Sequence, residues 1–300
     1  MNNYILENFR NIDINEKDMR SISIFPSGNF LSISGSNSIK IWDLNFTILQ
    51  HIKSQFDNWL CCSDIKDENN FVISSDDKNI TTWIKKNDKF EFNKLIKTNH
   101  KKCILKVKYF KNGNIISTSI DNTIKIFEQN EKYEYQNIIT LCHSKIIRSI
   151  LLYENKNIFI SSGDDGTKFW NLNNNECIFN FKNVFCCFWN SLYKIDDDNF
   201  IVGEKNSFKI ICISKKLIIK DIKTGFSCNG ICYIKDKNIL IVAGSLNILL
   251  FKYNNNFEYI QKIQNQSDIN INGLIELKNG LIISYSHNKI LRIWVLKNYN

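Results

Sequence analysis

The sequence has little of the residues that mark fibrous or linker-like chains. Of its 300 residues, one is proline and 11 are glycine. These low counts exclude collagen-like repeats and proline-rich linkers. Because 43% of the residues are hydrophobic and 23% are charged, the composition also excludes general disorder. It predicts a folded chain with a sizeable core.

Long apolar runs are also missing. No stretch approaches about 18 uninterrupted apolar residues, so we expect no membrane-spanning helix. The opening segment MNNYILENFRNIDINEKD has neither the apolar core nor the small-residue cleavage site of a secretory signal. We therefore expect a cytoplasmic protein without membrane association, and a nuclear location stays open.

The cysteines and acidic residues show no metal-binding pattern. None of the ten cysteines is spaced as C-x-x-C, and no H-E-x-x-H motif is present. We expect the cysteines to be reduced and mostly buried. The acidic run Asp196–Asp198 lies where two strands should join and is interpreted as a solvated turn. Since phosphate-binding loops are missing too, no cofactor and no metal are predicted.

A pattern of short strands repeats along the chain. Each copy ends in an aromatic or large apolar residue, as in IKIWDL (39–44) and TKFWNL (167–172). Equivalent residues follow one another at intervals of about 40 to 44, which is typical of four-stranded propeller blades. These residues are Trp42, Trp83, Phe127, Trp170, Ile211, Phe251 and Trp294.

The seventh copy lacks an outer strand, because the chain ends shortly after Trp294. The segment YILENF (4–9) belongs to no copy and can supply the missing strand. Its pairing with the last blade would close the ring and remove an unpaired sheet edge. We therefore predict one domain, 1–300, with closing strand 4–9 and repeats at approximately 19–52, 59–97, 103–141, 146–182, 186–223, 228–264 and 270–296.

The repeat resembles the WD40 repeat over essentially the whole chain. The supporting segments are FPSGNFLSISG before IKIWDL, SIDNTIKIF after an Asn-His pair, and SSGDDGTKFW after a Cys-His pair. The WD dipeptide itself occurs once, as Trp42-Asp43, and copies five and six are degenerate. The resemblance implies an all-β fold, a single seven-bladed WD40-type β-propeller, which we expect to be monomeric.

Two groups of polar residues invite a catalytic interpretation, because Ser, His and Asp form hydrolase triads. The WD40 resemblance implies instead structural tetrads, which satisfy buried polar groups within one blade. The residues are His143, Ser161, Asp165 and Trp170 in the fourth copy, and His100, Ser117 and Asp121 in the third, where Phe127 replaces the Trp. We predict no catalytic residues and no enzyme.

The start of each innermost strand indicates a binding site. Alignment of the copies puts Arg20, Leu60, Leu105, Arg148, Asn190, Asn229 and Asn272 at equivalent positions. The WD40 resemblance implies that these positions rim the mouth of the central channel. Guanidinium and amide donors suit a carboxylate or a phosphate. We expect Trp59, Lys102, Asp76, Ile120, Asp164 and Lys205 on the same face. Alternatively, the asparagines merely contact channel water.

The resemblance implies a scaffold without chemistry of its own, and fold alone does not select the partner. We predict a protein–protein recognition module in a multi-subunit complex, with an acidic or phosphorylated partner at the channel mouth. An adaptor role in cytosolic iron–sulfur protein assembly stays open, since TTWIKKNDKFEF (81–92) and EQNEKYEY (128–135) look similar to two blades of that WD protein. A ubiquitin-ligase substrate receptor also stays open, although WDLN (42–45) lacks the Arg of the W-D-x-R motif.

The formal net charge of +9 raises the question of nucleic acid. Adjacent lysines occur only as isolated pairs, at 85–86, 101–102 and 215–216. No RNA-recognition signature accompanies them. Non-specific attraction to RNA is the most that this pattern predicts. A ribosome- or RNA-associated scaffold is therefore the alternative from another class.

Overall fold

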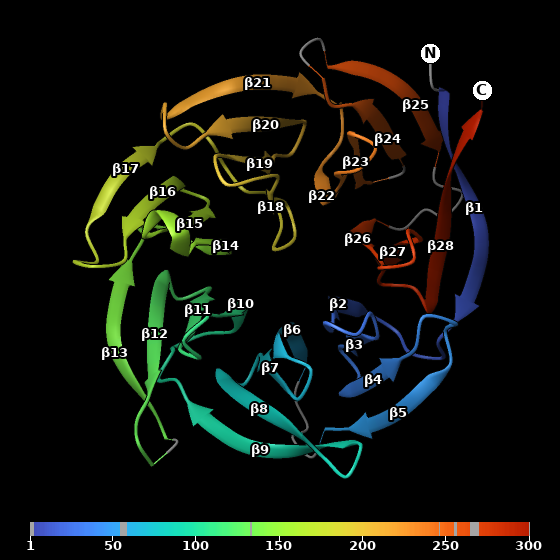
Figure 1. Ribbon diagram of the computed structural model, residues 1–300. Coiled ribbons are helices and arrows are strands. Elements are labelled where there is room, and N and C mark those ends of the chain that lie inside the picture. Colours follow the sequence, from blue (N-terminus) through green and yellow to red (C-terminus); the bar gives the residue numbers. More distant parts are fainter. Residues whose placement is uncertain are drawn as a thin grey trace. The chain divides into compact units, whose positions relative to one another are not determined.

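The computed structural model describes residues 3–54, 59–132, 134–245, 247–254, 257–264 and 270–299 (Figure 1). Tyr133, which belongs to the segment EQNEKYEY, lies outside them. Apart from the short 3₁₀ helix η1 (Glu154–Lys156), the regular elements of the described residues are strands. No helix within these ranges has the length and apolar character needed to cross a bilayer.

The chain divides into two compact units, of which one comprises Arg20–Trp189. It contains four antiparallel sheets of four strands each, and consecutive strands are neighbours in every sheet. The strands are β2 (Met19–Ile24), β3 (Phe30–Ser34), β4 (Ser38–Trp42), β5 (Ile48–Lys53), β6 (Leu60–Asp67), β7 (Asn70–Ser75), β8 (Asn79–Lys86), β9 (Lys89–Lys97), β10 (Ile104–Tyr109), β11 (Ile115–Ser119), β12 (Thr123–Gln129), β13 (Tyr135–Cys142), β14 (Ile147–Tyr153), β15 (Ile158–Gly163), β16 (Gly166–Asn171) and β17 (Cys177–Phe181).

The other unit comprises Met1–Met19 and Asn190–Asn300 and contains three four-stranded sheets. Two of them again follow the order of the chain, and the third has the order β1-β28-β27-β26. The strands are β1 (Asn3–Asp13), β18 (Leu192–Lys194), β19 (Asn199–Gly203), β20 (Ser207–Cys212), β21 (Leu217–Lys223), β22 (Cys228–Ile234), β23 (Ile239–Gly244), β24 (Asn247–Lys252), β25 (Glu258–Gln264), β26 (Ile271–Glu276), β27 (Ile282–Ser286) and β28 (Ile290–Tyr299).

The N-terminal strand is the fourth strand of the last sheet. β1 pairs antiparallel with β28, from Asn3 opposite Tyr299 to Asp13 opposite Ile290. Figure 1 shows β1, in blue, beside β28, in red. The prediction of an all-β fold with seven four-stranded blades, the last completed by the N-terminal strand, is thus confirmed.

Burial explains why the inner and outer strands differ in sequence. Every residue of β3, β15, β20 and β23 is buried, as expected for short, mostly apolar runs. The outer strand β13 alternates between exposed and half-buried residues instead. Between inner strands the chain turns at residues with left-handed backbone, such as Asn122 with a φ of 69°. Asn tolerates this conformation and therefore suits such turns.

The innermost strands β6, β10, β14, β22 and β26 have a β-bulge at their beginning, whereas β18 pairs with β19 without one. In β6, Leu60 lies opposite Ser75 and Cys62 opposite Ser74, so Cys61 is the extra residue. Equivalent bulges occur at Leu105, Arg148, Asn229 and Asn272. The alignment that put Leu60 in this series was therefore wrong by one residue. A bulge changes which face of the strand a side chain occupies, and Leu60 is buried in the core at 3% exposure.

Candidate functional site

The sheet β14–β17 contains a chain of hydrogen bonds between its polar residues. His143 bonds through Nδ1 to Asp165 and through Nε2 to the Ser161 hydroxyl, at 2.6 Å. The indole Nε1 of Trp170 donates to the same hydroxyl at 2.8 Å. Because Ser161 is fully buried, its hydroxyl is not accessible to a substrate. The arrangement of Ser, His and Asp therefore joins the loop before β14 and the turn between β15 and β16 to strand β15.

Burial and hydrogen bonding set the charges in this chain. Burial lowers the pKa of His143 below its ordinary value of 6.5, although Asp165 opposes the shift. For Asp165, burial alone would raise the pKa, but hydrogen bonds from His143 and Ser144 outweigh it and lower the pKa to about 2. A neutral histidine can then donate Nδ1–H to the carboxylate and accept from Ser161, which satisfies every group.

The sheet β10–β13 repeats this chain without the indole. His100 bonds through Nε2 to Ser117 at 2.9 Å and through Nδ1 to Asp121 at 3.1 Å. Phe127 replaces the Trp and is buried at 1% exposure. Indole-to-serine bonds without a histidine occur in two further sheets, from Trp42 to Ser32 and from Trp294 to Ser284. The sequence analysis did not identify these two pairs.

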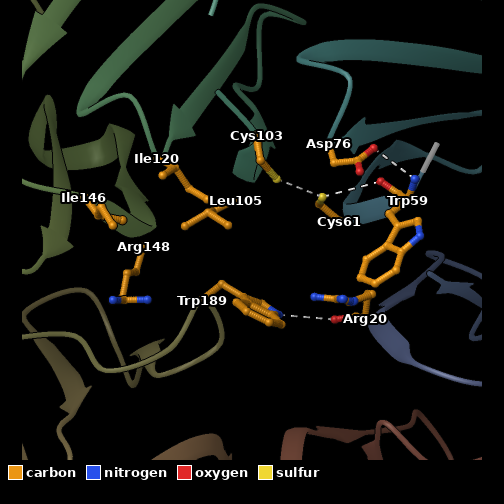
Figure 2. A pocket seen from close by; sticks show the side chains of 10 residues that line it. All are labelled: Arg20, Trp59, Cys61, Asp76, Cys103, Leu105, Ile120, Ile146, Arg148 and Trp189. Carbon is orange, nitrogen blue, oxygen red and sulfur yellow. Dashed lines mark hydrogen bonds between the residues drawn. The ribbon is translucent and has the colours of Figure 1, made fainter. Parts of the chain in front are cut away.

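A pocket of about 310 Å³ opens in the unit Arg20–Trp189 (Figure 2). Two kinds of residue recur around it: the residue that precedes β6, β10 or β14 and the bulged residue of that strand. The lining residues are Arg20, Trp59, Cys61, Asp76, Cys103, Leu105, Ile120, Ile146, Arg148 and Trp189. The bulges therefore direct side chains from successive sheets into one space.

Arg20 lies between two indole rings at the edge of this pocket. Its guanidinium carbon is 5.3 Å from the ring centre of Trp59 and 5.5 Å from that of Trp189. Such distances correspond to cation–π contact. The Trp189 Nε1 also donates to the Arg20 carbonyl at 3.4 Å, and Phe188 stacks on the Trp189 ring. Arg20 is thus held in place by aromatic contacts, whereas the Trp59 side chain stays 57% exposed.

Arg148 lines the same pocket, but its positive charge is paired with the carboxylate of Asp164. Its Nε and Nη2 donate to the two carboxylate oxygens of Asp164, at 2.8 and 3.0 Å. Burial would lower the pKa of Arg148, but this bidentate pairing raises it. Asp76 accepts a hydrogen bond from the Trp59 backbone N–H at 3.0 Å. With these two carboxylates nearby, the pocket is less basic than two arginines alone imply.

The remaining predicted binding residues lie elsewhere. Lys102 is exposed and is not among the lining residues of the pocket. Asn190, Asn229 and Asn272 belong to the other unit. Asn272 is fully buried and donates to the Met19 carbonyl, while Asn190 donates to the Asn272 carbonyl and the Tyr285 hydroxyl. Asn229 is also buried, at 5% exposure. The amides of Asn190 and Asn272 thus have partners within the chain, and a binding role of the three asparagines stays a prediction.

Several pocket residues were missed by the sequence analysis. Trp189, Cys61, Cys103 and Ile146 line the pocket without having been predicted to do so. Trp189 directly precedes the aligned Asn190, just as Trp59 precedes an innermost strand. A large aromatic residue immediately before an inner strand was therefore a usable signal.

No metal centre emerges within the described ranges, where no three or more His, Cys, Asp or Glu side chains gather suitably. The carboxylates of the run Asp196–Asp198 accept hydrogen bonds from nearby parts of the chain instead. Asp196 accepts from the backbone of Asp198 and from Asn199. Asp198 accepts from the backbone and hydroxyl of Ser214. None of the ten cysteines, each of them in the described part of the chain, forms a disulfide.

Comparison with known families agrees with these repeats. Residues 10–43 and 93–128 match the model of the WD40 family, described as WD domain, G-beta repeat. The second match contains His100, Ser117 and Asp121. A search of curated proteins gives no match. Two segments of the chain are thus similar to the WD40 repeat, and the repeated four-stranded sheets agree with this likeness.

Proposed function

We propose that the protein is a non-catalytic interaction module that binds an acidic or phosphorylated segment of a partner protein. WD40 propellers generally serve as protein-interaction scaffolds. The proposed site is the pocket bordered by Arg20, Trp59 and Arg148. The observation that carries the proposal is the guanidinium of Arg20, held between two indoles at the edge of an open cavity.

The aromatic contacts of Arg20 favour recognition of an anion. Because the two rings already restrict the arginine, less side-chain entropy is lost when it binds. A guanidinium pairs well with a carboxylate or phosphate, often through two hydrogen bonds. Trp and Arg are also the residues enriched at the energetic centres of interfaces. The exposed Trp59 gives such a centre a large apolar surface.

The rest of the pocket favours an apolar side chain next to the anion. Leu105, Ile120 and Ile146 supply an aliphatic surface. Asp76 and Asp164 offset part of the positive charge. We therefore propose a segment with one apolar anchor beside one carboxylate or phosphate, in preference to a long acidic tract. The family match carries no subfamily, so roles in iron–sulfur protein assembly or ubiquitin ligation stay predictions, as do the cytoplasmic location and the monomeric state.

Selection of random and phosphorylated peptide libraries on the purified protein tests this proposal. We expect enrichment of an apolar residue adjacent to Asp, Glu or a phosphoresidue. Replacement Arg20→Glu should weaken binding of the selected peptides by roughly 30-fold or more, as for a hot-spot residue of about 2 kcal/mol. The exposed Lys102→Glu is the matched control, because it makes the same charge change outside the pocket.

Two results would contradict the proposal. One is equal loss of affinity in both variants, since this would indicate an effect of net charge alone. The other is the absence of any selected motif together with RNA binding that weakens steeply with salt. That result would favour the RNA-associated scaffold.

A further inference from the structure

Two cysteine sulfurs face each other in the wall of the pocket. The Sγ atoms of Cys61 and Cys103 are 3.3 Å apart and point toward one another in Figure 2. Cys61 is the bulged residue of β6, and Cys103 directly precedes β10. Both are half-buried and both line the open cavity, so a small reagent can reach them. The contact therefore joins neighbouring sheets at an accessible position.

The two thiols differ in acidity. A hydrogen bond from the Cys61 thiol lowers the pKa of Cys103. The same bond, together with burial, raises the pKa of Cys61 well above its ordinary value. Arg20 favours the thiolate form of both, while Asp76 opposes it. Cys103 is thus the more acidic member of the pair, and we expect it to act as the nucleophile toward an oxidant.

We propose that Cys61 and Cys103 form an oxidisable dithiol site, which a hydroperoxide converts into a disulfide. The sulfurs line the pocket proposed above for partner binding, but the oxidation does not rest on that role. The cavity that the two cysteines line admits a small peroxide such as hydrogen peroxide. The contact between the two sulfurs places the second thiol beside the first.

The reaction has two balanced steps. The Cys103 thiolate attacks one peroxide oxygen, so that an S–O bond forms, the O–O bond breaks and the departing hydroxide takes up a proton to become water. Cys61 then attacks the Cys103 sulfur, an S–S bond forms and the S–O bond breaks. The leaving hydroxide takes the Cys61 proton and becomes a second water. Two thiols are oxidised by two electrons, and one peroxide is reduced to two waters.

The geometry requires only a short movement. A disulfide bond is about 2.05 Å long, so the sulfurs must approach by a little more than about 1 Å from their present separation. The bond would link two neighbouring sheets across the pocket wall. The Cys61 Sγ also lies 3.5 Å from the Trp59 carbonyl oxygen, a second acceptor for its one proton. Oxidation of Cys61 removes that proton and alters the environment of an exposed indole.

Peptide mapping of the purified full-length protein after limited hydrogen peroxide tests this site. We expect a Cys61–Cys103 disulfide, formed before the exposed Cys142 is oxidised, because Cys103 has a lowered pKa and a second thiol beside it. Tryptophan fluorescence should change with the same time course. In Cys61→Ser the reaction should stop at a sulfenic acid on Cys103, trapped by dimedone, whereas Cys142→Ser should leave the disulfide unaffected.

Oxidation of Cys142 before the pair would overturn the proposal. So would a dimedone adduct on Cys61 in Cys103→Ser that forms as fast as the adduct on Cys103 in Cys61→Ser. Melting curves establish that the variants are folded, and the mapping of the unmodified chain decides the question if one is not. Because no partner is used, a negative result leaves the proposed recognition function untouched.

Discussion

The sheets β14–β17 and β22–β25 have similar backbones but differ in the side chains that fill their interiors. Each has a bulge at the second residue of its innermost strand, Arg148 in one and Asn229 in the other. Each second strand also ends in a glycine. A Cβ on Gly163 would lie 2.0 Å from the Ile146 carbonyl oxygen, and a Cβ on Gly244 would lie 1.6 Å from that of Ser227. Close backbone approach thus requires glycine at both positions.

Their interiors follow different chemistry. The first sheet holds the hydrogen-bonded chain that ends on Trp170, with 6% exposure. In the second, Phe251 occupies the equivalent position with 5% exposure and packs edge-on against Phe208. The comparison teaches that the blade backbone does not depend on the polar chain. Apolar packing fills the same space where no polar group needs a partner.

Truncation of a buried ring in the apolar sheet β22–β25 should have the largest effect on stability. Phe251→Ala is expected to lower the free energy of unfolding by about 3–5 kcal/mol, because a cavity replaces a buried ring. Urea denaturation measures the change, and Phe251→Leu, which keeps much of the volume, should cost clearly less. Equal losses in the two variants would mean that ring packing is not what holds this sheet.

Removal of a polar partner should have an intermediate effect in the other sheet. Asp165→Ala leaves the Nδ1 of His143 and the backbone N–H of Ser144 without their acceptor. We expect a loss of about 1–3 kcal/mol in the free energy of unfolding, the usual cost of unsatisfied buried groups. The control is the adjacent Asp164→Ala, whose more exposed pairing with Arg148 should contribute about 0–1 kcal/mol. A larger loss for Asp164→Ala would refute the structural role of the chain.

Acidification should lower the free energy of unfolding through His143 by a smaller amount, and the sheet β22–β25 has no such histidine. Because folding lowers the pKa of His143, the unfolded chain binds more protons just below pH 6.5. Stability is therefore fully present above that pH and is lost as pH falls toward the folded pKa, by at most about 1.4 kcal/mol per pH unit for one proton. His100 shifts in the same direction, so His143→Gln should remove only part of the slope.

Melting temperatures between pH 8 and 5 measure this dependence. His100→Gln, measured in parallel, should likewise remove only part of the slope. A slope that His143→Gln leaves unchanged would show that the histidine is not held neutral in the fold.

Pattern and period were sufficient for much of the fold. The interval between Trp42, Trp83 and the later equivalents predicted the four-stranded sheets, because every copy must bury the same inner strands. The unmatched segment 4–9 predicted that the N-terminal strand completes the last sheet, and β1 does so. Polar residues spaced as in WD40 repeats were expected to meet, and those around His143 and His100 lie within hydrogen-bond distance.

The candidate site was accessible to sequence reasoning only in part. Arg20, Trp59 and Arg148 were selected from their position before or within inner strands, and they line one pocket. Their charge balance could not be foreseen, because the pairing of Arg148 with Asp164 depends on side-chain geometry. Because of the bulge in β6, Cys61 and not Leu60 is equivalent to Arg148. An alignment of the sequence alone does not reveal such a shift.

By itself, then, the sequence determined the number of sheets, their strands and their buried faces, since these follow from hydrophobic periodicity. Tertiary structure alone decided which side chains at equivalent positions reach a surface. Arg148 opens into a pocket, whereas Asn272 is buried against a backbone carbonyl. The tertiary structure also brings together Cys61 and Cys103, which are far apart in the chain. The physical reason is that periodicity encodes burial along a strand, while contacts between sheets depend on the packing of the whole blade against its neighbour.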